Sequence, residues 1–506
     1  MREEKRNLFF VLFLLAIIVL RIPCLFLPLV GDFSTKQCAY AMIARNFSID
    51  REFLFPKIDY IIDGKKSYHL LEFPFPAYLA GFLWRVFKGN LDFWGKVVNL
   101  MFFLGSLVFM FILVKKITSE EISYMSVLIF SILPLSFIFS VFFQMEGAML
   151  FFLTGGICFF FQWYEERKNI FIFLWVIFSG LLFLLKPHAL VYYFFPLSLF
   201  LIKRDKKRFF CQYIFFSILS FIPVILWILH VIKTVQVSSN IVYSLVDSVG
   251  VREFPPSLLF EFSFYKRLFE RLSNVVFTPM GFAFLVCGVV FFRKFKYGDF
   301  LFFWGMSLVI YMFLLPRKMI ELPYYLLPLA VFGSIFIADF INNLNSTVFK
   351  KYIIIFLLLI VSSIYFIPAV FISPFRNRCV LEASKFVEKE IPKEAFIVAA
   401  HGSGCDLLYY CKRPGWNLLI NESNINKMYT KKEIEYFAKK RKRILKDSVE
   451  EMKYFVKKGA QYLVIAPKQD LFKNKSFHKY VSSNFSLIKE GRDYIVYEVK
   501  EKMRNN

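Results

Sequence analysis

The chain has 506 residues, of which 58% are hydrophobic and 69 are phenylalanine, and its formal net charge is +25. Soluble domains are about 45–50% apolar, so this composition excludes an ordinary soluble class and favours a membrane protein. The basic balance does not by itself indicate nucleic acid as a partner, because we expect much of the positive charge in short cytoplasmic loops.

Long apolar segments recur along the chain. A membrane-spanning helix needs about 20 apolar residues, and about eleven segments meet this requirement. The first segment is too long for a signal peptide and has no small-residue cleavage site, so we expect it to remain as an anchor. The predicted spans are 7–29, 92–114, 121–142, 144–163, 169–186, 188–202, 209–231, 275–292, 298–315, 322–341 and 352–373.

Lysine and arginine are concentrated in every second short loop between these spans. By the positive-inside rule, these loops face the cytoplasm. The N-terminus is then cytoplasmic, whereas the loop 31–91 and everything after about residue 373 lie outside. We therefore expect an integral protein of the cell (inner) membrane. The basic residues that set this orientation are Arg2, Lys5, Arg6, Lys115, Lys116, Arg167, Lys168, Lys203, Arg204, Lys206, Lys207, Arg208, Arg293, Lys294, Lys296, Lys350 and Lys351.

The loop 31–91 after the first span is long and polar for so apolar a chain. It combines acids, bases and amides with amphipathic segments that we expect to form helices on the membrane surface. Asp32 follows the first span almost at once, and Glu72 immediately precedes an apolar amphipathic segment. Polar groups gathered beside a bilayer indicate a site rather than a linker.

A third acid, Glu146, lies at the outer turn between the third and fourth predicted spans, with no lysine or arginine near it in sequence. A carboxylate at this depth is costly, which favours a functional role. The alternative is a first-turn acid that the helix dipole stabilises.

Four basic residues on the same outer side break the positive-inside pattern. Lys186 and His188 follow the fifth span, and Arg317 and Lys318 occupy a very short outer turn. They fit snorkelling anchors, and they equally fit fixed cations that face a phosphate head group. For His188 the alternative is a packed or hydrogen-bonding histidine.

From about residue 376 helical and strand patterns alternate, which predicts a small extracytoplasmic α/β domain over 376–506. We expect helices over 381–389 and 431–457 and strands over 395–400, 462–466 and 494–499. Gly402-Ser403-Gly404 after the first strand fits a turn better than a phosphate loop, because a complete GxGxxG fingerprint is absent.

The eight cysteines are scattered, with no CxxC pair and no His-Cys cluster that would support a metal site. Cys405 and Cys411 are six residues apart in the predicted outer tail. A disulfide between them and two free thiols both stay open, depending on the compartment.

Several of these segments, in this order, resemble the C-type superfamily of membrane glycosyltransferases that use a polyprenyl-phosphate-linked sugar. The similar groups are bacterial protein O-mannosyltransferases and the transferase that puts aminoarabinose on lipid A. The resemblance covers roughly residues 7–370, together with a tail of matching placement, and implies a domain over 1–375. The matching segments are Tyr40–Phe47, Glu72–Leu79, Pro134–Ser136 leading to Glu146, Gly180 with Lys186-Pro187, and Tyr324 with Leu327-Pro328.

The resemblance implies inverting transfer of a hexose or pentose to a glycan, lipid or protein acceptor, with no nucleotide. Asp32 or Glu72 would act as the base, with Glu146 as a further acid. The donor phosphate would be bound by Lys186, His188, Arg317, Lys318 and Tyr324. Lys36, Gln37, Tyr40 and Arg45 would support the substrate loop. The family usually has an Asp-Glu pair where this chain has Lys36-Gln37, which removes the usual base.

Three alternatives to this transferase remain. A glycan polymerase or ligase would use similar lipid-linked chemistry. A lipid transporter should show internal repeats, and the sequence has none that we detect. A homologue that binds lipid phosphate without transferring sugar is the third. The sequence specifies no cofactor apart from the lipid-linked donor and leaves a divalent metal open.

Overall fold

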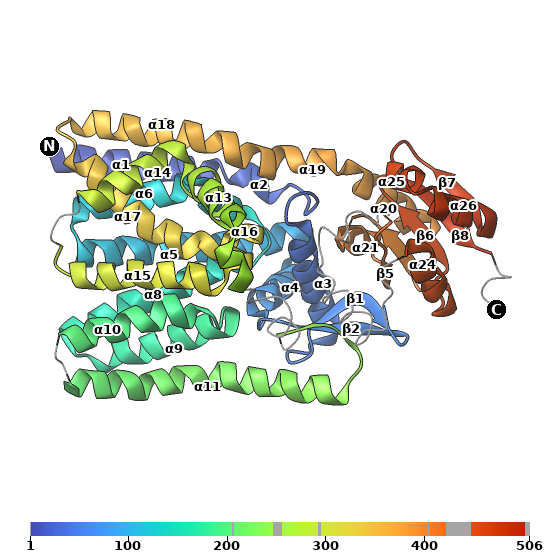
Figure 1. Cartoon of the computed structure of the whole chain (residues 1–506), viewed down its shortest axis with the longest axis horizontal. Coiled ribbons are helices and arrows are strands. Elements are labelled where there is room, and N and C mark those ends of the chain that lie inside the picture. The colour runs from blue at the N-terminus through green and yellow to red at the C-terminus, as the bar shows by residue number, and fades with distance from the viewer. Residues whose placement is uncertain are drawn as a thin grey trace. The chain divides into compact units, whose positions relative to one another are not determined.

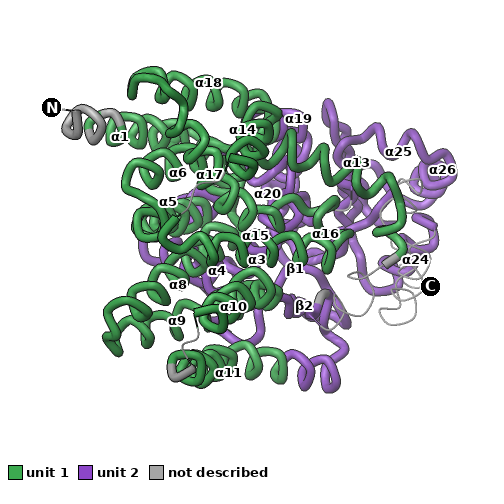
Figure 2. Tube along the Cα trace, turned by 60° about the vertical axis from the view of Figure 1, so that its left-hand side comes forward, with its two compact units in different colours: residues 1–26, 95–230, 253–370 green, residues 27–94, 231–252, 371–506 purple. Residues whose placement is uncertain are grey.

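The structure, a computed structural model, describes residues 2–204, 207–245, 256–291, 295–402, 404–420 and 447–500. It contains two compact units, which Figure 2 shows in green and purple. The first unit comprises Met1–Phe26, Gly95–His230 and Glu253–Val370, and the second comprises Leu27–Trp94, Val231–Arg252 and Phe371–Asn506. The second unit thus combines the loop 31–91, a short internal segment and the tail.

The first unit is built from apolar helices (Figure 1). Among the described residues, five helices are long and apolar enough to cross a membrane, or seven if each of two bent pairs is one span. Four further apolar helices have only 10–17 residues. Each of the eleven predicted segments overlaps one of these helices or pairs, while length and composition support five to seven spans.

The helices that lie wholly or mainly in this unit are α1 (Arg2–Val19), α2 (Ile22–Leu25), α5 (Leu91–Ile117), α6 (Glu120–Ile132), α7 (Pro134–Val141), α8 (Glu146–Glu166), α9 (Asn169–Leu185), η1 (Leu190–Phe194), α10 (Phe195–Lys203), α11 (Lys207–Val237), η2 (Pro256–Phe260), α13 (Phe262–Glu270), η3 (Arg271–Val276), α14 (Thr278–Val290), α15 (Gly298–Leu314), α16 (Pro316–Glu321), η4 (Pro323–Leu326), α17 (Leu327–Asn343) and α18 (Val348–Ile367).

Proline sets the break between α6 and α7. Pro134 has no backbone N–H and is favoured at a helix start, so α6 ends at Ile132 and the two helices meet at 67°. The turn after α7 leads directly to Glu146, the first residue of α8. The break therefore determines where this acid enters the helix bundle.

The second unit contains an eight-stranded sheet with the strand order β3-β2-β1-β5-β4-β6-β8-β7. Strands β4, β5 and β6 are parallel, and β6, β8 and β7 are antiparallel. Its elements are α3 (Ser34–Asp50), β1 (Lys57–Ile62), β2 (Lys65–Leu70), α4 (Phe75–Phe87), β3 (Ile241–Ser244), α20 (Arg378–Glu390), β4 (Ile397–Ala400), α21 (Asp406–Cys411), β5 (Gly415–Asn417), α24 (Ser448–Lys457), β6 (Tyr462–Ile465), α25 (Gln469–Lys473), α26 (Lys475–Asn484), β7 (Phe485–Glu490) and β8 (Ile495–Val499).

Helices cover both faces of the central strands. Val398 packs in one apolar cluster with residues of α24 and α26, whereas its neighbour Ala399 packs in another with residues of α20 and α21. Successive side chains of a strand point to opposite faces, so strands covered on both faces read as continuous apolar runs. This is why the sequence predicts β4, β6 and β8 close to their observed bounds.

The hairpin formed by β1 and β2 is not among the predicted elements. Asp63 and Gly64 form its turn, with φ of +48° and +77°. Asp-Gly is a favoured pair for such a left-handed two-residue turn. Strand β1 also pairs with β5, so the loop 31–91 and the tail share one sheet.

Two predictions for the tail concern a disulfide and the helices over 431–457. Cys405 and Cys411 are both buried free thiols, so the disulfide alternative is wrong. Of the helices expected over 431–457, α24 accounts for the end, and residues 431–446 lie outside the described part of the chain.

Candidate functional site

A buried ion pair joins two of the predicted site residues in the first unit. Lys186 Nζ lies 3.2 Å from Glu146 Oε1, and the side chains are 5% and 0% exposed. Lys186 directly follows α9, and α9 packs along α8, which begins at Glu146. Neighbouring helix ends therefore bring together charges that lie 40 positions apart in the chain.

The turn before α8 is held from α5. The Asn99 side-chain oxygen accepts a hydrogen bond of 2.8 Å from the backbone N–H of Gly147, and its amide donates to the Phe139 carbonyl. Gly147 allows this approach, because a Cβ there would lie 2.4 Å from the Asn99 backbone oxygen. Glu146 is thus fixed at the positive end of the α8 dipole, as a first-turn acid should be.

Two tyrosine rings of η4 contact the basic side chains around this ion pair. Lys186 Nζ lies 5.2 Å from the ring centre of Tyr324 and 5.6 Å from that of Tyr325. Lys318 Nζ lies 5.2 Å from the Tyr325 ring, on which His188 also stacks at 4.8 Å. Aromatic faces attract cations at such distances. We call Glu146, Lys186, His188, Lys318, Tyr324 and Tyr325 the tyrosine cluster.

The structure thus brings together five of the six site residues predicted in this unit, and adds Tyr325. Arg317, the sixth, pairs with Glu321 one helical turn away at 2.7 Å. Sequence reasoning also missed Gln144. Its side chain is 1% exposed, and neither amide atom has a hydrogen-bond partner among the described residues. A buried amide without partners is costly, and its position two residues before Glu146 was the available signal.

Glu72 in the second unit is held by two side chains of α3. The Tyr40 hydroxyl donates to Glu72 Oε1 at 2.6 Å, and Lys36 Nζ lies 3.3 Å from the same oxygen. Lys36 also lies 5.6 Å from the Tyr40 ring centre. The charge of Lys36 is therefore balanced by Glu72.

Asp32 differs from Glu72 in its surroundings. It is exposed at the start of α3, and its carboxylate forms no hydrogen bond or ion pair with the described residues. Only its backbone is fixed, because its N–H donates to Ser373 Oγ at 2.9 Å and its carbonyl accepts from Gln37. The Asp32 carboxylate is thus available to a substrate, whereas that of Glu72 already binds two donors.

Arg45 belongs to a buried structural network. It pairs with Asp59, donates to the Tyr409 carbonyl at 3.2 Å and stacks over the Tyr409 ring. Burial alone would raise the pKa of Asp59, but the charges of Arg45 and Lys66 and hydrogen bonds from Lys66 and Asn46 outweigh burial and lower this pKa. Arg45 therefore ties α3 to β1 and α21 and contacts neither Asp32 nor Glu72 through its guanidinium in any of these interactions.

After β4, the carboxylate of Asp406 is bound by neighbouring groups of the same unit. Asp406 accepts from Ser34 Oγ at 2.9 Å and from the backbone N–H of Leu407, and it lies 3.3 Å from His401 Nε2. These bonds favour a turn over a phosphate loop at 402–404, of which Ser403 lies outside the described residues. Within the part of the chain that the structure describes, no group of three or more His, Cys, Asp or Glu residues is placed to hold a metal ion.

Solved structures with a similar fold were found. ArnT from Cupriavidus metallidurans bound to undecaprenyl phosphate superposes with a TM-score of 0.65 and 11% sequence identity, covering 97% of this chain and 98% of that chain. Archaeoglobus fulgidus oligosaccharyltransferase in the apo form gives 0.55 and 13%, covering 98% and 74%. AglB from the same organism, in complex with an inhibitory peptide and a dolichol-phosphate, gives 0.51 and 12%, covering 98% and 74%.

This chain shares its fold with ArnT and with the Archaeoglobus fulgidus oligosaccharyltransferase. The similarity predicted from the sequence motifs is confirmed at the level of the fold, and it covers nearly the whole chain. No protein-family model matches the sequence, and no curated protein sequence matches it at a significant level. At 10–13% identity among these structures, only the fold carries over.

Proposed function

We propose that this protein is a membrane glycosyltransferase that takes a hexose or pentose from a polyprenyl-phosphate carrier. The observation that carries this proposal is the tyrosine cluster, in a fold shared with ArnT bound to undecaprenyl phosphate. The cluster holds two lysines against one carboxylate, so it favours an anion. Lysines facing a phosphate stabilise the negative charge that grows as the phosphate leaves.

The acceptor hydroxyl is activated by Asp32, whose exposed carboxylate has no partner among the described residues. Its proton passes to Asp32 as the hydroxyl oxygen bonds to C1 of the sugar. The bond between C1 and the phosphate oxygen breaks, and polyprenyl phosphate leaves with the electron pair. Direct displacement inverts the anomeric carbon and forms no covalent enzyme intermediate.

Glu72 supports this step through Lys36 and Tyr40. It positions α3, whose first turn follows Asp32, and offsets the charge of Lys36. The acceptor is a glycan, lipid or protein on the outer face. The proposed topology has eleven spans, a cytoplasmic N-terminus, and an extracytoplasmic tail from residue 376.

Transfer from a labelled donor tests the proposal directly. Purified full-length protein in liposomes should release polyprenyl phosphate from a polyprenyl-phosphate hexose or pentose when outer-membrane glycans and lipids are supplied. Lys318→Met should raise the KM for the donor at least tenfold. Lys453→Met is the matched control, because among the described residues this exposed lysine of α24 contacts only Glu450 and the Tyr480 ring and none of the tyrosine cluster. Equal donor KM values in the two variants would show that the tyrosine cluster does not bind the donor.

A second function is favoured by one observation. Lys36 replaces an acid that similar proteins carry and pairs with Glu72, so the protein could bind lipid phosphate without transferring sugar. Tight binding of undecaprenyl phosphate, with no transfer to any acceptor and no effect of Asp32→Asn, would support this binding function over the transferase.

A further inference from the structure

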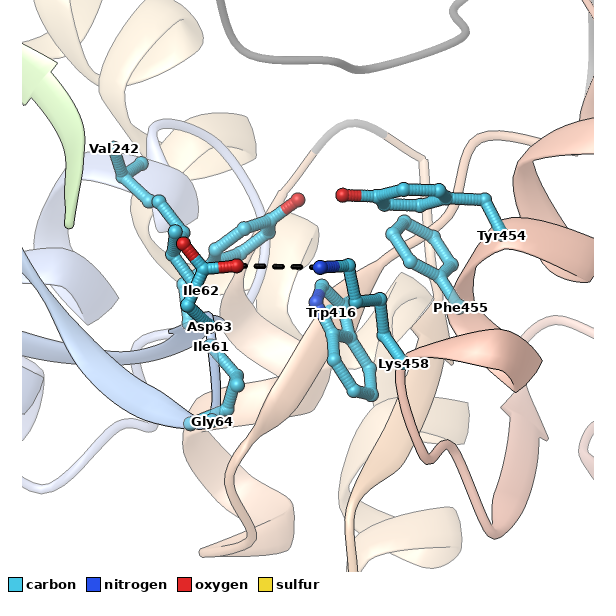
Figure 3. Close-up of a pocket in the computed structure, with 10 residues that line it drawn as sticks. Ile61, Ile62, Asp63, Gly64, Val242, Trp416, Tyr454, Phe455 and Lys458 are labelled. Carbon is cyan, nitrogen blue, oxygen red and sulfur yellow. Dashed lines mark hydrogen bonds and ion pairs between the residues drawn. The ribbon is translucent and has the colours of Figure 1, made fainter. Parts of the chain in front are cut away.

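A pocket in the second unit is separate from Asp32, Glu72 and their partners. It lies between the β1–β2 turn, β5 and the end of α24 (Figure 3). Its cavity volume is about 70 Å³. Four segments distant in sequence build it, the fourth being β3 with Val242, and none of the residues that line it was predicted to have a role.

The floor of the pocket is aromatic and rigid. Trp416 stacks on Phe455 with ring centres 5.4 Å apart and planes 18° apart. The two side chains are 4% and 1% exposed, and Phe396 packs edge-on against Trp416 at 5.8 Å. Tyr454 stands beside Phe455 above this floor, as Figure 3 shows. Trp416 and Phe455 are thus a buried support, and the half-buried Tyr454 ring beside them offers a preformed apolar face at little entropic cost.

The rim of the pocket is charged. Asp63 and Lys458 meet across the pocket at 3.2 Å, and their side chains are 62% and 41% exposed (Figure 3). Asp63 is presented by the left-handed hairpin turn, which fixes its backbone. A pair this exposed contributes little to stability. Asp63 and Lys458 can therefore give up their mutual contact and bind a ligand at a low cost in free energy.

This combination selects a class of ligand. A pyranose ring has a face of C–H groups that packs on aromatic rings and an edge of hydroxyls that both donate and accept hydrogen bonds. Asp63 can only accept and Lys458 can only donate, so together they satisfy such an edge. A phosphate would meet the like charge of Asp63, and an acyl chain would leave both charges without partners.

We propose that this pocket binds one pyranose ring of a glycan acceptor, with the rest of the glycan outside. The inference rests on the proposed function, for which it names the acceptor class. The small cavity and the exposed Asp63-Gly64 rim fit a single ring, with its C–H face on the aromatic side chains and its hydroxyl edge at Asp63 and Lys458. The pocket would raise the local concentration of the acceptor without taking part in bond formation.

Saturation-transfer NMR on the full-length protein tests the pocket without relying on catalysis. The probes are the methyl glycosides of glucose, mannose and galactose, and the protein is kept in a sugar-free detergent, because maltoside detergents would compete. We expect transfer to the ring protons of at least one glycoside. Tyr454→Ala and Lys458→Met should each reduce that signal at least fivefold. Phe472→Ala is the control, since this exposed aromatic of α25 does not line the pocket.

Three outcomes would contradict sugar binding by the pocket. They are the absence of a signal from any glycoside, equal signals in both pocket variants and the control, and a signal that survives in Lys458→Met. The last variant changes only an exposed side chain. The near-ultraviolet circular dichroism of each variant checks folding. Sugar transfer to a glycan with an unchanged acceptor KM in Tyr454→Ala would contradict the pocket and leave the proposed function standing. Glycoside binding without any sugar transfer would support the pocket and contradict the proposed function.

Discussion

Lys186 and Glu146 form an ion pair with 3.2 Å between Nζ and Oε1, and both side chains are almost fully buried. Two charges removed from water are tolerated only while each faces the other. The pair therefore links the acid at the start of α8 to the base at the end of α9. It also holds the Lys186 side chain beside Tyr324 and Tyr325.

Glu146→Gln should destabilise the folded protein by about 3 kcal/mol, because it leaves Lys186 buried without its carboxylate. The double variant Glu146→Gln/Lys186→Gln should recover most of that stability and none of the donor affinity. Thermal unfolding in detergent and donor KM measure the two effects. Additive losses in the double variant would show that the two residues are not coupled.

The assignment of the base to Asp32 predicts an asymmetry between the two acids of the second unit. Asp32→Asn should lower kcat at least 100-fold with little change in stability, because its exposed carboxylate makes no bond with the described residues. Glu72→Gln should lower the melting temperature as well as kcat, since it weakens the contacts with Lys36 and Tyr40. Lys36→Met in the Glu72→Gln background should restore part of the stability. A fully active Asp32→Asn enzyme would transfer the role to Glu72.

The sequence predicts best those parts whose signal is local. Apolar runs locate the apolar helices, because a membrane-spanning helix must be apolar along its length. Each of the eleven predicted segments overlaps such a helix or bent pair among the described residues, of which five to seven are long enough to span. The strands β4 and β6 are recognisable because burial on both faces makes them continuously apolar. The site residues stand out singly because acids and bases are rare near a bilayer.

What the sequence could not show depends on pairing across long distances. Strand β1 joins β5 at Tyr60 and Gly415, a contact over 355 positions that no local pattern encodes. The Asp63-Gly64 turn was a readable hairpin signal, but the flanking Lys65-Lys66 weakened the strand pattern. Likewise, the choice between Asp32 and Glu72 depends on which of them Lys36 contacts, and that follows from the packing of α3 against residue 72.

His401 predicts a pH dependence of the second unit. Burial lowers its pKa, but the hydrogen bond and charge of Asp406, with the Ala466 carbonyl and the Asp470 charge, outweigh burial and raise it above 6.5. A raised pKa in the folded state stabilises the protein below the unfolded value, and this stability is lost as the pH rises through the folded pKa. The wild type should therefore lose melting temperature between pH 6 and 9 relative to His401→Gln. Parallel curves for the two proteins over this range would contradict a charged His401–Asp406 pair.

Arg21 in the first unit is fully buried and has no carboxylate partner among the described residues. It donates to Ser131 O at 2.6 Å, to Ser140 Oγ at 2.8 Å and to Ile17 O at 2.9 Å. Its guanidinium lies 4.4 Å from the Phe137 ring centre. Ser131 lies in the last turn of α6, where the break at Pro134 leaves carbonyl groups without helical donors. Arg21 thus bridges the two sides of this break.

Arg21→Leu should lower the melting temperature clearly, because a buried carbonyl that loses its donor costs about 1–3 kcal/mol. Arg21→Lys should restore part of it, since an ammonium can reach one of the two helices but cannot span both with a planar fork. Leu20→Ala is the control, because this neighbour is 45% exposed. Since α7 leads to Glu146, Arg21→Leu should also raise the donor KM at a temperature where the variant is still folded. A variant with the wild-type melting temperature and KM would show that Pro134 alone maintains the break.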